Sequence, residues 1–179
     1  MPHPPRGYCI YCCSHTNHPA PGNGLTLLVS NASSCLQVLL TTPLQAQVFV
    51  IGLRKSFTIC NIYISPNEDV SYNDIKSLIN QLPTPFILTG DVNAKHPMWG
   101  SDTTDPHGRV FSQALVNLDI SLLNNGAKTH YHVQTNTLSV IDVTICSSDL
   151  QAELVWDVDG DPRGSDHYSI IVGISPNRQ

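Results

Sequence analysis

Two polar side chains that could do chemistry, Asp91 and Asn93, follow a short apolar run at 86–88 and the pair Thr89-Gly90. Side chains two residues apart in an extended segment point to the same face. A carboxylate and a carboxamide would therefore lie side by side at the end of a buried strand, where layered α/β folds meet their ligands. On this stretch alone, an Asx-rich turn that merely follows a strand is an equal alternative.

Further polar side chains stand at the ends of other predicted strands. Asp142 lies within the apolar run 140–145, where a lone carboxylate is costly unless it is paired or hydrogen-bonded. His167 directly precedes the last predicted strand, and Tyr63 ends another. A buried aspartate beside a histidine at the mouth of a sheet is the arrangement of a carboxylate-oriented general base. Either residue alone also fits as a satisfied core group, but together with Asp91 they favour a site.

The elements that must position these residues are mostly strands. The predicted strands cover residues 8–13, 25–29, 35–40, 48–51, 57–63, 86–90, 120–123, 140–145, 154–156 and 168–174. An amphipathic helix is predicted within 67–82, where apolar residues recur at i, i+3, i+4 and i+7, with Ser71 or Asn73 as its N-cap. A second helix is predicted to begin near Pro106 or Gly108, with Asp105 as its N-cap. Two sheets packed face to face with helices outside fit this pattern better than a doubly wound parallel sheet.

Length and composition bound the class of protein. The 179 residues suit one domain, 1–179, with an irregular Pro-rich start at 1–7. With 41% hydrophobic and 13% charged residues the chain can bury a core, and its net charge of −5 offers no basic surface for nucleic acid. No run approaches the roughly 18 apolar residues of a membrane span. The N-terminus lacks the apolar centre of a secretory signal, so cytosol or nucleus with reduced thiols is expected.

A group of potential zinc ligands lies near the N-terminus. The group consists of Cys9, Cys12, Cys13, His15 and His18. A structural zinc site needs a second ligand pair at a set spacing, and none is visible. The preferred interpretation is that the cysteines are small buried apolar residues in strands.

Four motifs, in chain order, resemble those of the endonuclease/exonuclease/phosphatase superfamily, which includes deoxyribonuclease I and the apurinic/apyrimidinic endonucleases. They are Asn61-Ile62-Tyr63, Gly90-Asp91-Val92-Asn93-Ala94, Ser139-Val140-Ile141-Asp142 and Ser165-Asp166-His167. The extension through residues 95–100 is more specifically similar to the endonuclease domain of non-LTR (LINE-type) retrotransposons, as is Thr129 before the Ile-Asp motif. The resemblance implies an α+β fold, the four-layer α/β/β/α sandwich of deoxyribonuclease I.

The resemblance also implies a reaction, the metal-assisted hydrolysis of a phosphodiester in double-stranded DNA with Mg²⁺ or Mn²⁺ as cofactor. His167, oriented by Asp142, would act as general base or stabilise charge on the phosphorane. Asp91 would help activate the attacking water, and Asn93 would position the water or the phosphate. Tyr63 would donate a hydrogen bond to a phosphate oxygen.

Further roles come from the same resemblance. Ser165 and Thr129 would lie near the phosphate, and Asp166, together with Asp91, near the metal. In the family the nick leaves a 3′-hydroxyl that primes reverse transcription. The parent protein is therefore expected to carry a reverse transcriptase domain and to act in the nucleus, after transit through the cytoplasm.

The acidic residues depart from the family pattern at one point. Family members open with a strand that carries an Asn, followed by a strand that carries the metal-binding Glu, whereas the first acidic residue here is Glu68. The sequence thus predicts a domain that lacks its first two strands. One alternative is a catalytically inactive, truncated remnant of such a domain. Another is a superfamily phosphodiesterase that acts on lipid or inositol phosphates, against which Trp99-Gly100 argues.

Overall fold

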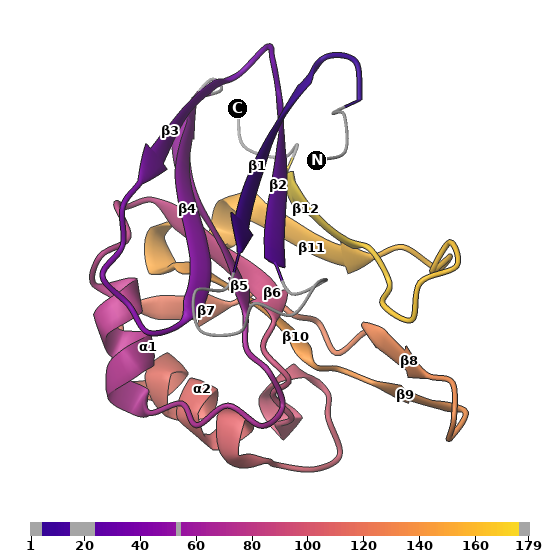
Figure 1. Ribbon diagram of the computed structural model, residues 1–179. Coiled ribbons are helices and arrows are strands. Elements are labelled where there is room, and N and C mark those ends of the chain that lie inside the picture. The colour runs from indigo at the N-terminus through magenta and orange to yellow at the C-terminus, as the bar shows by residue number, and fades with distance from the viewer. Residues whose placement is uncertain (1–4, 15–23, 53–54, 176–179) are drawn as a thin grey trace.

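The computed structural model describes residues 5–14, 24–52 and 55–175 (Figure 1). The strands are β1 (Tyr8–Ser14), β2 (Gly24–Ser30), β3 (Ser34–Val38), β4 (Gln45–Gly52), β5 (Ser56–Tyr63), β6 (Phe86–Asp91), β7 (Ile120–Leu122), β8 (His130–His132), β9 (Thr137–Ser139), β10 (Asp142–Ser147), β11 (Leu154–Val158) and β12 (Ile170–Ile174). The helices are α1 (Tyr72–Ile79) and α2 (Pro106–Asn117), with short 3₁₀ turns at Pro97–Trp99 and Ser148–Glu153. Strands dominate, as the sequence predicts.

A mixed six-stranded sheet forms the centre of the molecule, in the order β3-β4-β5-β6-β10-β7. Strands β5 and β6 run parallel, and the other neighbours are antiparallel. The last residue of β6, Asp91, stands opposite the first residue of β10, Asp142. Side chains opposite each other on adjacent strands share one face, so this register alone brings the two carboxylates together.

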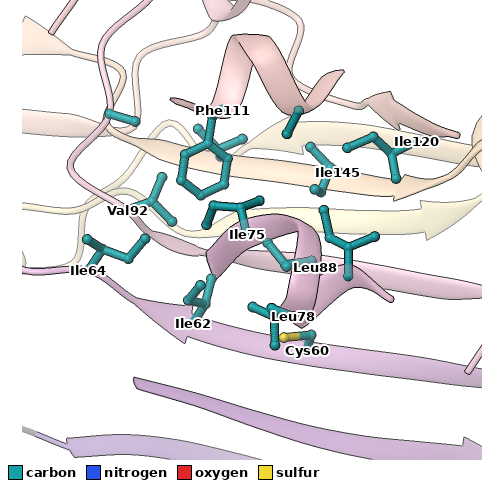
Figure 2. Packing of buried hydrophobic residues seen from close by; sticks show 14 of the residues in the cluster. Cys60, Ile62, Ile64, Ile75, Leu78, Leu88, Val92, Phe111, Ile120 and Ile145 are labelled. Atoms are coloured by element: carbon teal, nitrogen blue, oxygen red, sulfur yellow. The ribbon is translucent and has the colours of Figure 1, made fainter. Parts of the chain in front are cut away.

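Both helices pack on the same face of this sheet (Figure 1). Figure 2 shows how Ile75 and Leu78 of α1 and Phe111 of α2 lie in one cluster with Leu88 and Ile145 of the sheet. All five are at most 1% exposed. Because each such side chain stabilises the fold by about 1.5–3 kcal/mol when fully buried, the helix layer firmly fixes where β6 and β10 lie.

The predicted helix starts are confirmed. Ser71 caps α1 in a capping box with Asp74, and Asp105 caps α2 by accepting a hydrogen bond from the N–H of Gly108 at 2.7 Å. Helix α1 ends at Ile79, earlier than predicted. Beyond it, the N–H groups of Gln81 and Leu82 donate to the carbonyls of Leu78 and Ile79, three residues back, as in a 3₁₀ turn and not in an α-helix.

The opposite face of the sheet is covered by two hairpins, β1–β2 and β11–β12, which belong to separate sheets in the described part of the chain. The amide of Asn61 donates to the carbonyl of Thr26 at 3.4 Å and so ties β2 to β5. The indole N–H of Trp156 donates to Oγ1 of Thr144 at 3.0 Å and ties β11 to β10. Two polar contacts therefore hold the hairpins over β5, which ends at Tyr63, and β10, which begins at Asp142.

The predicted fold class is confirmed as α+β with a mixed central sheet, but the described residues do not form all four predicted layers. The described residues make three layers, helices, sheet and hairpins. The two helices share one face because their apolar stripes enter the same buried cluster. No described helix covers the outer side of the hairpins.

The hairpin β8–β9 was not predicted. Its strands have only three residues each, too few for an alternating pattern to stand out. In Figure 1 the hairpin extends away from the sheet, and residues 132–138 are exposed. It begins directly after Thr129 and ends at Ser139, the first residue of the motif that contains Asp142, so it borders the predicted site.

The described cysteine side chains differ in burial, and Cys35 on β3 is half-buried. Cys60 and Cys146 are buried among apolar residues of the sheet, as predicted, and burial raises the pKa of Cys60 to about 12. Cys9 and Cys12 are exposed on β1, so the prediction of burial is wrong for them. Strand β1 pairs only with β2 among the described residues, which leaves these side chains open to solvent.

The remaining potential zinc ligands, His15 and His18, lie outside the described residues, as does the side chain of Cys13. No helix in the described ranges is long and apolar enough to cross a membrane.

Candidate active site

Asp142 and His167 form the centre of the site. Nδ1 of His167 lies 3.2 and 3.1 Å from the two carboxylate oxygens of Asp142. The other ring nitrogen, Nε2, lies 3.8 Å from Oδ2 of Asp91. The imidazole therefore spans the two paired carboxylates, with one nitrogen held and the other directed at Asp91.

The backbone around Asp142 is fixed from two sides. Oγ1 of Thr129, a fully buried residue, accepts from the N–H groups of Ile141 and Asp142 at 3.3 and 3.4 Å. The side chain of Asn124 donates to the carbonyl of Asp142 at 3.0 Å and accepts from the N–H of Thr144 at 2.8 Å. Such contacts orient the carboxylate before any substrate arrives.

The turn that carries His167 is fixed as well. The N–H of His167 donates to Oγ of Ser165 at 3.1 Å, and the N–H of Tyr168 donates to the carbonyl of Thr129 at 2.8 Å. Thr129 therefore contacts both halves of the pair, Asp142 through its hydroxyl and the His167 turn through its carbonyl. The structure places its side chain inside the protein, where it orients Asp142.

Asn93 lies next to Asp91 in a left-handed backbone conformation, with φ +46°. Its N–H donates to Oδ1 of Asp91 at 3.0 Å, and its side-chain Nδ2 donates to the carbonyl of Ile64 at 3.0 Å. The first contact is an Asx turn. The sequence left open whether Asp91 and Asn93 form an Asx turn or part of a site. The structure shows the turn, and this turn holds the Asp91 carboxylate beside His167.

Tyr63 ends β5 beside this turn. It alternates with Ile62 and Ile64, which are buried against the helices, so its side chain faces the same side of the sheet as Asp91. The N–H of Ile64 donates to the carbonyl of Asp91 at 2.9 Å. No hydrogen bond joins the Tyr63 side chain to Asp91, Asn93, Asp142 or His167.

Asp166 and Ser165 lie at the rim. The Asp166 side chain is 61% exposed, and its Oδ2 lies 3.8 Å from Nε2 of His130. Ser165 is exposed, with its hydroxyl engaged by the His167 N–H. The predicted metal contact of Asp166 and the phosphate contacts of Ser165 and Thr129 remain predictions.

His130 is a site residue that the sequence did not single out. Its ring packs edge-on against His167, with 4.7 Å between the ring centroids. Burial lowers the pKa of His130, and the nearby His167 acts in the same direction. In the sequence, only its position next to Thr129 pointed to His130, and a single histidine in a polar stretch does not predict a site residue.

The electrostatics of the site favour proton transfer. Burial raises the pKa of Asp91 to about 6, and the charge of Asp142 acts in the same direction. The hydrogen bond to Asp142 raises the pKa of His167 above its ordinary value, although burial opposes the shift. Groups that change protonation near neutral pH suit general acid–base chemistry.

The acidic side chains do not by themselves make a divalent-cation site. Hard cations need several oxygen ligands. Asp142 is committed to His167, and Asp91 uses Oδ1 for the N–H of Asn93. Across residues 5–14, 24–52 and 55–175, no three His, Cys, Asp or Glu side chains are grouped so that they could hold a metal ion. Asp91 and Asp166 therefore supply at most part of a metal site.

An open cavity of about 410 Å³ adjoins Asn93. Lys95, Glu68 and His107 are among the residues that line it. The cavity gives Asn93 an open side toward which a substrate could extend.

The fold and this site define a member of the endonuclease/exonuclease/phosphatase superfamily. The structure is similar to the endonuclease domain of TRAS1, a telomere-specific non-LTR retrotransposon, with a TM-score of 0.78 and 26% identity over 94% of this chain and 79% of that one. It also shares its fold with the AP endonuclease LMAP from Leishmania major, at a TM-score of 0.67 and 13% identity over 96% and 72% of the two chains.

Within that superfamily, residues 57–171 match the family model described as endonuclease-reverse transcriptase, and the chain belongs to this family. The RNA-directed DNA polymerase from mobile element jockey of Drosophila melanogaster is 29% identical over 132 residues, which are 70% of this chain. They are only 14% of that relative. By family and structure the chain is an endonuclease domain of the non-LTR retrotransposon type.

Proposed function

We propose that this domain nicks double-stranded DNA by phosphodiester hydrolysis and leaves a 3′-hydroxyl that primes reverse transcription. The observation that carries the proposal is the imidazole of His167, held at Nδ1 by Asp142 and facing Asp91 with Nε2. This is a general base oriented by one carboxylate and placed beside a second.

In this reaction Nε2 of His167 takes a proton from the attacking water, because Nδ1 keeps its N–H on Asp142. Asp142 holds that tautomer and stabilises the imidazolium that forms, as the aspartate does in hydrolase triads. Asp91 aligns the water, Asn93 binds the water or a phosphate oxygen, and Tyr63 donates to another. The water oxygen bonds to phosphorus, the bond from phosphorus to the 3′ oxygen breaks, and a 5′-phosphate and a 3′-hydroxyl result.

We further propose that the active form binds Mg²⁺ or Mn²⁺ through Asp91, Asp166 and at least one carboxylate that this sequence does not supply. Support comes from the incomplete ligand set and from the unmatched fifth of the TRAS1 domain. The hairpins β1–β2 and β11–β12 have strand edges at which further strands could add. A divalent cation would also offset the repulsion between DNA and a chain of net charge −5.

The proposal includes the setting of the reaction. Jockey's protein is an RNA-directed DNA polymerase, so we propose that the parent of this chain carries a reverse transcriptase domain and acts on DNA in the nucleus.

A plasmid-nicking assay tests the function. Supercoiled plasmid is incubated with Mg²⁺ and wild-type protein, His167→Ala, or the control His132→Ala, which changes an exposed histidine nearby. We expect wild type and control to relax the plasmid, His167→Ala to fail, and a DNA polymerase to extend the nick directly. Equal nicking by all three proteins, or a nick that cannot be extended, would contradict the proposal.

An inactive domain is the second candidate. It is favoured by the lack of any acidic residue before Glu68 and by the incomplete metal ligands. The same assay separates the two, since a folded wild-type protein that never exceeds the buffer control supports inactivity.

A further inference from the structure

The backbone carbonyl groups of residues 92–95, directly after Asp91, are all bound by the segment that follows them. The bonds join Val92 O and Asn93 O to Nδ1 of His107 (3.1 and 3.3 Å), Ala94 O to Nε1 of Trp99 (2.9 Å) and Lys95 O to the N–H of Asp105 (3.1 Å). These residues belong to no helix or strand. The turn that carries Asn93 is therefore shaped by side-chain and backbone groups from the 3₁₀ turn at Pro97–Trp99 and from the start of α2.

His107 makes a further contact on its other side. Nε2 lies 2.8 Å from the carbonyl oxygen of Glu68, in the loop after β5. One imidazole, only 6% exposed, thus joins two loops that border the site. Carbonyl oxygens only accept hydrogen bonds, so in each of these contacts the imidazole ring is the donor.

The helix that carries His107 is rigidly placed. Asp105 caps it, and a Cβ at Gly108 would lie 1.9 Å from the carbonyl oxygen of Lys95, so only glycine permits this approach. Phe111, one turn further along, is buried in the same cluster as Val92 (Figure 2). His107 therefore binds Val92 and Asn93 from a support that cannot easily shift.

We propose that His107 is a positioning residue of the active site. By fixing the carbonyls of Val92 and Asn93, it holds Asn93 in its left-handed conformation, with its N–H on Asp91 and its amide on Ile64. Non-glycine residues keep such a conformation only where their surroundings enforce it. The kinetic part of this inference rests on the proposed nicking activity; the structural part does not.

The kinetic test compares His107→Leu, which removes both ring donors, with His107→Gln, which restores one donor group, and with the exposed control His132→Leu. Rates are measured well below each melting temperature, with circular dichroism to verify folding. We expect kcat of His107→Leu to fall by about 10²-fold with little change in KM, since small misplacements of reacting groups cost that much. His107→Gln should recover part of the loss. A rise in KM alone would overturn the proposal.

The structural test measures hydrogen exchange of the Asn93 amide by NMR. We expect faster exchange in His107→Leu, an intermediate rate in His107→Gln, and no change for the amide of Leu88 in β6. This readout holds even if wild type does not nick DNA, so failure of the proposed function and failure of the positioning role are distinguishable. If His107→Leu does not fold, His107→Gln carries the test. Wild-type exchange and wild-type kcat in the folded variant would contradict the inference.

Discussion

Folding places the carboxylate of Asp91 in a position that costs stability. The pKa of Asp91 is raised to about 6 by burial and by the neighbouring charge of Asp142, against an ordinary value of 3.8. Because the folded-state pKa is the higher one, the group favours folding below pH 3.8, and this contribution is lost as the pH rises through 6. A residue that opposes folding at neutral pH suggests selection for chemistry.

Replacing Asp91 by Asn should therefore stabilise the protein. Above pH 6 in metal-free buffer we expect a gain of about 1–3 kcal/mol in the free energy of unfolding, since the charge is removed while an oxygen remains for the Asn93 N–H. The gain should shrink as the pH is lowered towards 4. Urea unfolding measures it, with the exposed Asp119→Asn as control. A loss of stability at pH 7.5 would contradict this account.

His167 gives a second prediction at the residue scale. Its pKa is raised mainly by the hydrogen bond to Asp142. Asp142→Asn removes the negative charge, so the pKa of His167 should fall towards its ordinary value. NMR titration of the histidine ring in EDTA-treated protein measures the shift. An unchanged or higher pKa would show that the Asp142 carboxylate is not its cause.

Strand and helix positions show how much of the fold could be predicted. Caps such as Ser71 and Asp105 were identified because their signal is local. The polar strand ends led to Asp91, Asn93, Asp142 and His167 because buried strands tolerate few such residues. The short hairpin β8–β9 and the contacts of His107 were missed, since they depend on tertiary neighbours rather than on any periodic pattern.

The approach of β6 to β5 gives a prediction at the scale of elements. A Cβ at Gly90 would lie 1.8 Å from the carbonyl oxygen of Ile62, so Gly90→Ala must push the strands apart beside the site. We expect a loss of more than about 2 kcal/mol in the free energy of unfolding. Gly160→Ala is the matched control, because a Cβ there meets no atom within 4 Å. Equal stability of the two variants in urea unfolding would refute the close approach.

At the scale of the whole molecule, Asp91, Asp142 and His167 lie together at one edge of a sheet that both helices cover. His167 and Asp142, the proposed base and its orienting carboxylate, are in contact, whereas the described residues do not complete a metal site. The sequence indicated this imbalance, because its first acidic residue is Glu68. It could not indicate that both helices share one face, which depends on how the complete chain packs.

The incomplete set of metal ligands leads to a prediction about the affinity of this chain for Mg²⁺. With only Asp91 and Asp166 available, we expect Mg²⁺ to bind no more tightly than about 10⁻³ M. NMR titration with Mg²⁺ should shift the signals of these two residues gradually, without saturation at low concentration. Saturation in the micromolar range would mean that the chain completes the site by itself.

The central claim is that Asp142 and His167 act as one unit in phosphodiester hydrolysis. Single-turnover plasmid nicking by wild type, Asp142→Asn, His167→Ala and the double variant tests it directly. We predict that His167→Ala is slower by at least about 10²-fold and that adding Asp142→Asn slows it no further. Wild-type nicking by His167→Ala, or a double variant slowed by the product of the two single effects, would contradict the claim.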